Sequence, residues 1–136
     1  MSWEACTRTF IRKVSPDPEK IASLIETALA RRKFVQSIVV TEKNVSFIIE
    51  NYYEVLKELL VALLLQHGMR SSNHQCLFTF FSREYGHDAE VAVIKQLNYL
   101  RNRLEYYGEQ MEYNYFKENH KSFEHIIDLL LKLVRA

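Results

Sequence analysis

The residues best placed to do chemistry lie near position 100, where Arg101 and Asn102 are adjacent and Tyr106 follows Asn102 by four residues. Arg101 borders an apolar stripe, and a guanidinium there requires an anion or a stacked partner. Glu105, four residues on, can supply that anion in a purely structural pair. Asn102 and Tyr106 form a second polar pair at the same spacing. We take Arg101, Asn102 and Tyr106 as the candidate site.

The five histidines do not have the spacing of a metal site. A helical zinc pair needs ligands at i and i+4, whereas His120 and His125 are five residues apart and so about 140° apart around a helix. The others, His67, His74 and His87, fall in three separate predicted connections. We therefore expect no metal and no cofactor.

The two cysteines, Cys6 and Cys76, form no C-x-x-C pair. Cys76 lies two residues after His74, a spacing that does not bring the side chains face to face, so a cysteine nucleophile is disfavoured. We expect buried free thiols in a reducing, cytoplasmic compartment, with a disulfide as the alternative.

Two further clusters have a structural and a functional interpretation. The basic run Arg31-Arg32-Lys33 is typical of a solvated helix end, and contact with phosphate is the alternative. Most of the eight tyrosines gather at Tyr52-Tyr53 and between Tyr99 and Tyr115. Tyrosines at helical spacing are typical of core or interface, so a subunit interface and a ligand pocket both remain open.

The composition defines the scaffold that must position these groups. Only three glycines and two prolines occur in 136 residues, which excludes Gly-rich phosphate loops and argues against a sandwich or barrel. The formal charge is +1, a balance that does not favour non-specific binding to nucleic acid or membrane and does not exclude a local charged patch. No apolar run approaches the roughly 20 residues that span a bilayer, and no membrane association is expected.

The hydrophobic pattern predicts an all-α, antiparallel up-down bundle of about five helices around a four-helix core, forming one domain over residues 1–136. Helices are expected after caps at Asp17, Thr41, Ser72 and Asp88, with a last helix from about Asn114. Glycines 68, 86 and 108 each follow a predicted helix end. Residues 1–14 are expected to form a flexible or extended arm.

The segment from Leu100 to Gly108, with sequence LRNRLEYYG, resembles the signature helix of HEPN-domain proteins. Residues 52–68 resemble the long second helix of that family with its glycine stop, and residues 72–81 resemble the short capped helix that follows. The likeness extends roughly from Asp17 to Val134.

The resemblance implies a helical bundle that dimerises and is often the partner of a minimal nucleotidyltransferase in toxin–antitoxin-like modules. In active ribonuclease members, Arg stabilises phosphate charge and a His four to six residues later acts in acid–base steps. Tyr106 stands in this sequence where that His is expected, and a tyrosine is a poor base at neutral pH. We therefore expect a binding or toxin-like partner that contacts nucleotide or RNA phosphate through the Arg101-Asn102 surface. A metal-independent endoribonuclease and a non-catalytic dimerisation module are the alternatives.

Overall fold

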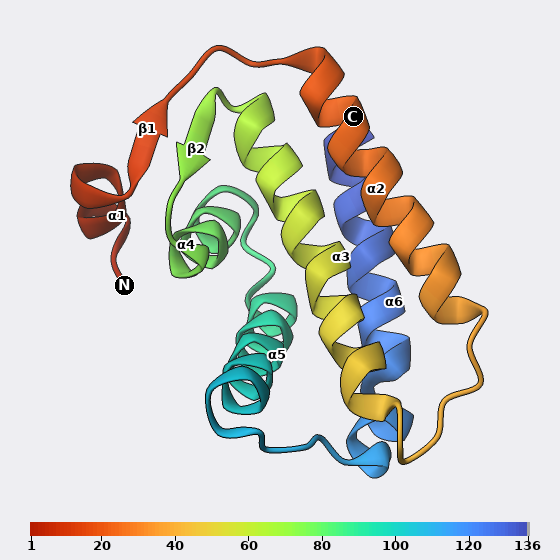
Figure 1. Cartoon of the computed structure of the whole chain (residues 1–136). Helices are drawn as coiled ribbons and strands as arrows, with labels where there is room; N and C mark the ends of the chain where they lie inside the picture. The colour runs from red at the N-terminus through yellow and green to blue at the C-terminus, as the bar shows by residue number, and fades with distance from the viewer. Residues whose placement is uncertain (136) are drawn as a thin grey trace.

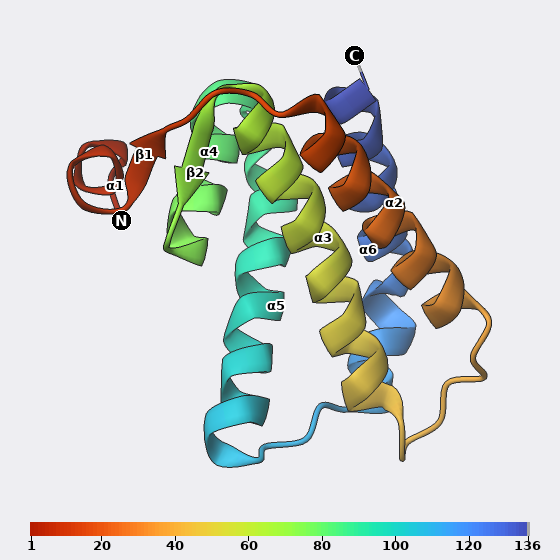
Figure 2. The same ribbon diagram turned by 45° about the horizontal axis from the view of Figure 1, so that its top comes forward.

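A computed structural model describes residues 1–135 and contains a helical bundle with one small sheet (Figure 1). The elements in chain order are α1 (Trp3–Thr9), β1 (Ile11–Lys13), α2 (Pro18–Gln36), α3 (Val45–Gln66), β2 (Met69–Ser71), α4 (His74–Tyr85), α5 (Asp88–Tyr107) and α6 (Tyr113–Arg135). The long helices α2, α3, α5 and α6 alternate in direction (Figures 1 and 2). The predicted all-α fold class is confirmed.

Helix α3 lies at the centre and packs against α2, α4, α5 and α6. The side chains predicted for its buried face are all less than 5% exposed: Val45, Ile48, Ile49, Tyr52, Leu56, Leu59, Leu60 and Leu63. The last turns of α3 are buried, as the sequence predicted, with Ala62, Leu63, Leu64 and Leu65 each less than 5% exposed. The predicted inward faces of α4 and α6 are also buried, with Phe80, Phe81 and Phe123 at 0% exposure.

One predicted cap is confirmed: Asp17 caps α2, accepting a hydrogen bond from the Lys20 amide at 3.1 Å. The last helix, expected from about Asn114, begins at Tyr113. Thr41 was predicted to cap α3, but the helix begins later, after Asn44. The two residues bond across a turn, with the Thr41 amide donating to Asn44 Oδ1 at 2.8 Å. That turn holds residues 41–44 out of the helix.

The other two expected caps shift by one residue. Asn73, not Ser72, caps α4, because its Oδ1 accepts from the Gln75 amide at 2.7 Å. Helix α5 begins at Asp88 with His87 in the cap position, and the Asp88 carboxylate instead accepts a hydrogen bond from Ser82 Oγ. All three glycines adopt positive φ just past a helix end, as expected.

The N-terminal segment differs from the expected flexible or extended arm. It forms α1 and β1, and β1 pairs antiparallel with β2 in the register Ile11 to Ser71. The structure also joins Cys6 of α1 to Cys76 of α4 in a disulfide, which corrects the expectation of free thiols. The spacing of the two cysteines in the sequence did not indicate this disulfide, because only the fold brings α1 against α4. The disulfide removes the cysteine-based argument for a reducing compartment.

Candidate functional site: a polar cluster between α3, α4 and α5

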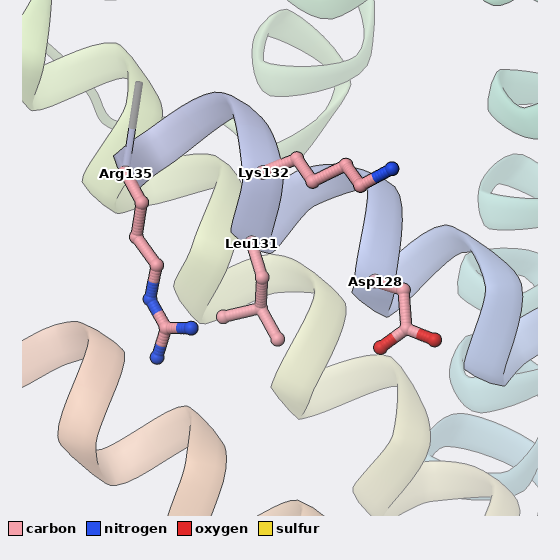
Figure 3. A pocket seen from close by; sticks show the side chains of 4 residues that line it. All are labelled: Asp128, Leu131, Lys132 and Arg135. Carbon is pink, nitrogen blue, oxygen red and sulfur yellow. The ribbon is translucent and has the colours of Figure 1, made fainter.

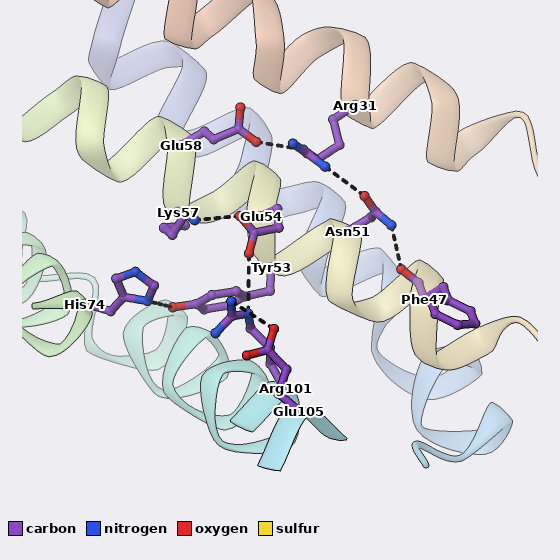
Figure 4. Close-up of polar contacts among 10 residues, drawn as sticks. All are labelled: Arg31, Phe47, Asn51, Tyr53, Glu54, Lys57, Glu58, His74, Arg101 and Glu105. Atoms are coloured by element: carbon purple, nitrogen blue, oxygen red, sulfur yellow. Dashed lines mark hydrogen bonds and ion pairs between the residues drawn. The ribbon is translucent and has the colours of Figure 1, made fainter. Parts of the chain in front are cut away.

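Arg101 points from α5 toward α3 and is held there by two carboxylates (Figure 4). Its Nη2 lies 3.1 Å from Glu105 Oε1, the predicted i+4 pair, and its Nε lies 3.4 Å from Glu54 Oε1. The guanidinium also lies over the Tyr53 ring, 5.5 Å from the centroid. The Arg101 side chain is 19% exposed, and within residues 1–135 its buried Nε has no partner in hydrogen-bond geometry. Arg101 therefore anchors α5 to α3.

Tyr53 and His74 extend this cluster toward α4. The Tyr53 side chain is fully buried, and its hydroxyl lies 3.1 Å from His74 Nδ1. Burial lowers the pKa of His74, and the positive charges of Lys57 and Arg101 lower it further. The imidazole is therefore neutral near neutral pH and can accept a proton or a hydrogen bond.

His74 was expected to lie in a connection and to have no functional role. It is instead the first residue of α4, and Figure 4 shows Tyr53 lying between it and Arg101. No spacing rule could have found this, because the two groups are on different helices and meet only through α3.

Carboxylates outnumber the cations around Arg101. Glu54 pairs with Lys57 at 2.6 Å as well as facing Arg101, and Glu105 lies on the other side of the guanidinium. Burial raises the pKa of nearby Glu50, and the negative charges of Glu105 and Glu54 add to that rise. Three carboxylates thus surround two cations, so Arg101 is neutralised in this arrangement and can contact phosphate only after release from its carboxylate partners.

Asn102 and Tyr106, the other two predicted site residues, lie away from this cluster. Tyr106 is 75% exposed, and Asn102 is half-buried. Neither side chain forms a hydrogen bond within the described part of the chain, so the expected polar pair between them does not form. Both lie beside Arg103, whose guanidinium is 4.7 Å from the Tyr107 ring centroid and 2.6 Å from Glu109 Oε2. Sequence analysis did not single out Arg103.

Two residues of the basic run near the end of α2, Arg31 and Arg32, form ion pairs, and the third, Lys33, is exposed. Arg31 Nε lies 2.7 Å from Glu58 of α3, and Arg32 Nη2 lies 2.7 Å from Glu124 of α6. Glu58 is only 8% exposed, so its pairing with Arg31 satisfies a buried charge. These two arginines tie α2 to its neighbours, which corrects the expectation of a solvated helix end for Arg31 and Arg32 and leaves neither free for phosphate. Lys33, in the last turn, is exposed as expected.

The remaining features do not add a second reactive centre. A depression of about 630 Å³ lies at the C-terminal end of α6, lined by Asp128, Leu131, Lys132 and Arg135 (Figure 3), on a different helix from the Arg101 cluster. No group of three or more His, Cys, Asp or Glu side chains in residues 1–135 could hold a metal ion. None of the described helices combines the length and apolar character needed to cross a membrane.

The fold and the site define a helical bundle protein with a paired, half-buried arginine on the inner side of α5 and exposed aromatic side chains on its outer side. The chain matches no protein-family model, no curated protein and no solved structure.

Proposed function

We propose that this chain is a HEPN-like binding protein, the partner of a minimal nucleotidyltransferase, and that it contacts nucleotide or RNA beside Arg101 and Asn102. The observation that carries the proposal is the division of α5 into two sides. The inner side is fixed to α3 through Arg101, and the outer side presents Asn102 and Tyr106, whose side chains form no hydrogen bond to residues 1–135.

The two sides have different roles in this proposal. Arg101 is a positioning residue, because its pairs with Glu54 and Glu105 hold the last turns of α5 in one orientation. The Asn102 amide can donate to a phosphate oxygen or a base edge, and the Tyr106 ring can stack. The HEPN resemblance supports a homodimer as part of the same proposal, which sedimentation velocity of the purified chain would test.

The experiment begins with the genes that flank the coding sequence. A small nucleotidyltransferase encoded there is co-expressed with this chain and co-purified, and nucleotide binding is measured on the complex. We expect Asn102→Ala and Tyr106→Ala to weaken association or nucleotide binding with the fold intact. Phe47→Ala is the matched control, because Phe47 is an aromatic side chain 63% exposed on another helix. Unchanged binding in both α5 variants, or no nucleotidyltransferase gene, contradicts the proposal.

A metal-independent endoribonuclease is the second candidate, and the position of His74 is the observation that favours it. A neutral imidazole near Arg101 can act as a base while the guanidinium, released from Glu105, stabilises phosphate charge. Purified protein is incubated with structured and single-stranded RNA in chelator. Cleavage that is lost in both His74→Ala and Arg101→Ala supports this candidate, and intact RNA across about pH 6–9 excludes it.

A further inference from the structure

The outer side of α5 carries two cationic side chains, three tyrosines and one asparagine on a single face of the helix. We call this group the α5 stripe and define it as Lys95, Tyr99, Asn102, Arg103, Tyr106 and Tyr107. The three tyrosines are among the most exposed large side chains of the molecule, at 59%, 75% and 72%. We propose that the α5 stripe binds unpaired nucleobases of a single-stranded nucleic acid by stacking, with Arg103 taking the phosphate. This inference rests on the proposed function and names its ligand and contact residues.

Arg103 is already arranged as an anion-binding fork between two aromatic rings. Its guanidinium carbon lies 4.7 Å from the Tyr107 ring centroid and 6.0 Å from that of Tyr99, within the range of cation–π attraction. Its Nε and Nη2 both lie within 2.7 Å of Glu109 Oε2. A phosphate oxygen can occupy the position of that carboxylate oxygen with the same geometry.

Glu109 is a replaceable partner. Its side chain is 54% exposed, and that of Arg103 is 38% exposed, so water screens the pair. Glu109 lies beyond the end of α5, in the connection to α6, where it can turn away without disturbing a helix. We therefore expect an incoming phosphate to displace Glu109, whereas Arg101, which is enclosed by two carboxylates, stays in place.

The chemistry of the α5 stripe favours nucleic acid over a protein partner. The only carboxylate between Lys95 and Tyr107 is Glu105, which pairs with Arg101 on the inner side. Within residues 1–135 the hydroxyls of its tyrosines have no hydrogen-bond partner, so they remain able to bond phosphate or sugar. Exposed aromatics interleaved with cations are typical of single-strand stacking surfaces.

The test is a fluorescence-anisotropy titration of the full chain with labelled oligouridine, in chelator and at low salt. We expect saturable binding that an abasic oligomer and a duplex of equal length do not reproduce. Single-stranded DNA should bind too, since stacking needs no 2′-hydroxyl. Tyr99→Ala and Tyr107→Ala should each weaken binding about 5-fold or more, as expected when one stacked base is lost. Glu109→Gln should strengthen it by freeing Arg103, an increase that a merely structural pair would not produce.

Phe47→Ala is the control, and circular dichroism verifies that each variant keeps its helices. Equal binding of abasic or duplex competitor, or no effect of the two tyrosine variants, overturns the inference. RNA binding that depends on Asn102 and not on the tyrosines overturns it while leaving the proposed function standing. If RNA does not bind and the tyrosine variants change the sedimentation coefficient, the α5 stripe is a protein interface. That result also overturns the inference. A wild-type chain that stacks on oligouridine but does not associate with the nucleotidyltransferase contradicts the proposed function and leaves this inference standing.

Discussion

Replacing Arg101 by glutamine tests whether this side chain anchors α5. The substitution keeps a polar side chain of moderate length but removes the charge that faces Glu54 and Glu105 at 3.4 and 3.1 Å. It also removes the cation that lies over the buried Tyr53 ring. The variant therefore leaves three neighbouring carboxylates with Lys57 as their remaining cation.

The size of the effect follows from burial. Removing one partner of a fully buried ion pair costs about 3–5 kcal/mol, whereas exposed pairs contribute about 0–1 kcal/mol. The side chains of Arg101 and Glu54 are 19% and 20% exposed, and Lys57 still pairs with Glu54 at 2.6 Å. These values place Arg101→Gln between the two limits, at a loss of about 2 kcal/mol in the free energy of unfolding.

Urea unfolding followed by circular dichroism measures this loss, with unchanged denaturant slope as the sign of an intact fold. Arg103→Gln is the matched control, because it removes the same charge two residues along the helix from a pair that lies at the surface. We expect that control to change stability little. If the two variants lose the same stability, Arg101 does not anchor α5 and the assignment of roles on this helix is wrong.

Three further predictions concern the scaffold. The double variant Cys6→Ser, Cys76→Ser should have a free energy of unfolding lower by about 4 kcal/mol, the chain-entropy value for a loop of 70 residues. If the variant and the oxidised wild type are equally stable, the disulfide is contradicted. Because the folded pKa of His74 is lowered, unfolding takes up a proton below the unfolded value near 6.5; stability should therefore fall as pH drops from about 6.5 toward the folded pKa, and urea titrations of His74→Gln should show a smaller fall. Gly68→Ala should destabilise more than Gly86→Ala in thermal melts, because both have positive φ but only at Gly68 would a Cβ lie 3.1 Å from the Val14 carbonyl oxygen; equal losses would contradict this.

The helical core was predictable because burial repeats at the period of the helix. Burial could be predicted without knowing which residues are in contact for Leu56, Leu59, Leu60 and Leu63. Any helix with apolar residues at that spacing must cover one face. The predicted cap at Asp17 was correct for a similar reason, because Pro18 fixes the first helical position. The Arg101–Glu105 pair was also local, at i+4, and the structure confirms it.

What sequence analysis missed depends on contacts between elements. The Cys6–Cys76 disulfide and the contact between Tyr53 and His74 each join segments that only the fold brings together. Strand β1 is three residues long and is stable only through its pairing with β2, so its alternation was too short to interpret. The ion pair of Arg31 could not be predicted for the same reason, because its partner Glu58 lies on the next helix.

The role of the two sides of α5 can be tested directly by NMR. Amide and side-chain shifts of the isotope-labelled chain are followed while single-stranded oligouridine is added in the presence of chelator. The account predicts that the largest changes occur at Tyr99, Arg103 and Tyr107, with Tyr53 and His74 unaffected. Changes centred on Tyr53 and His74, or on the depression at the end of α6, would contradict it, as would a spectrum that does not change.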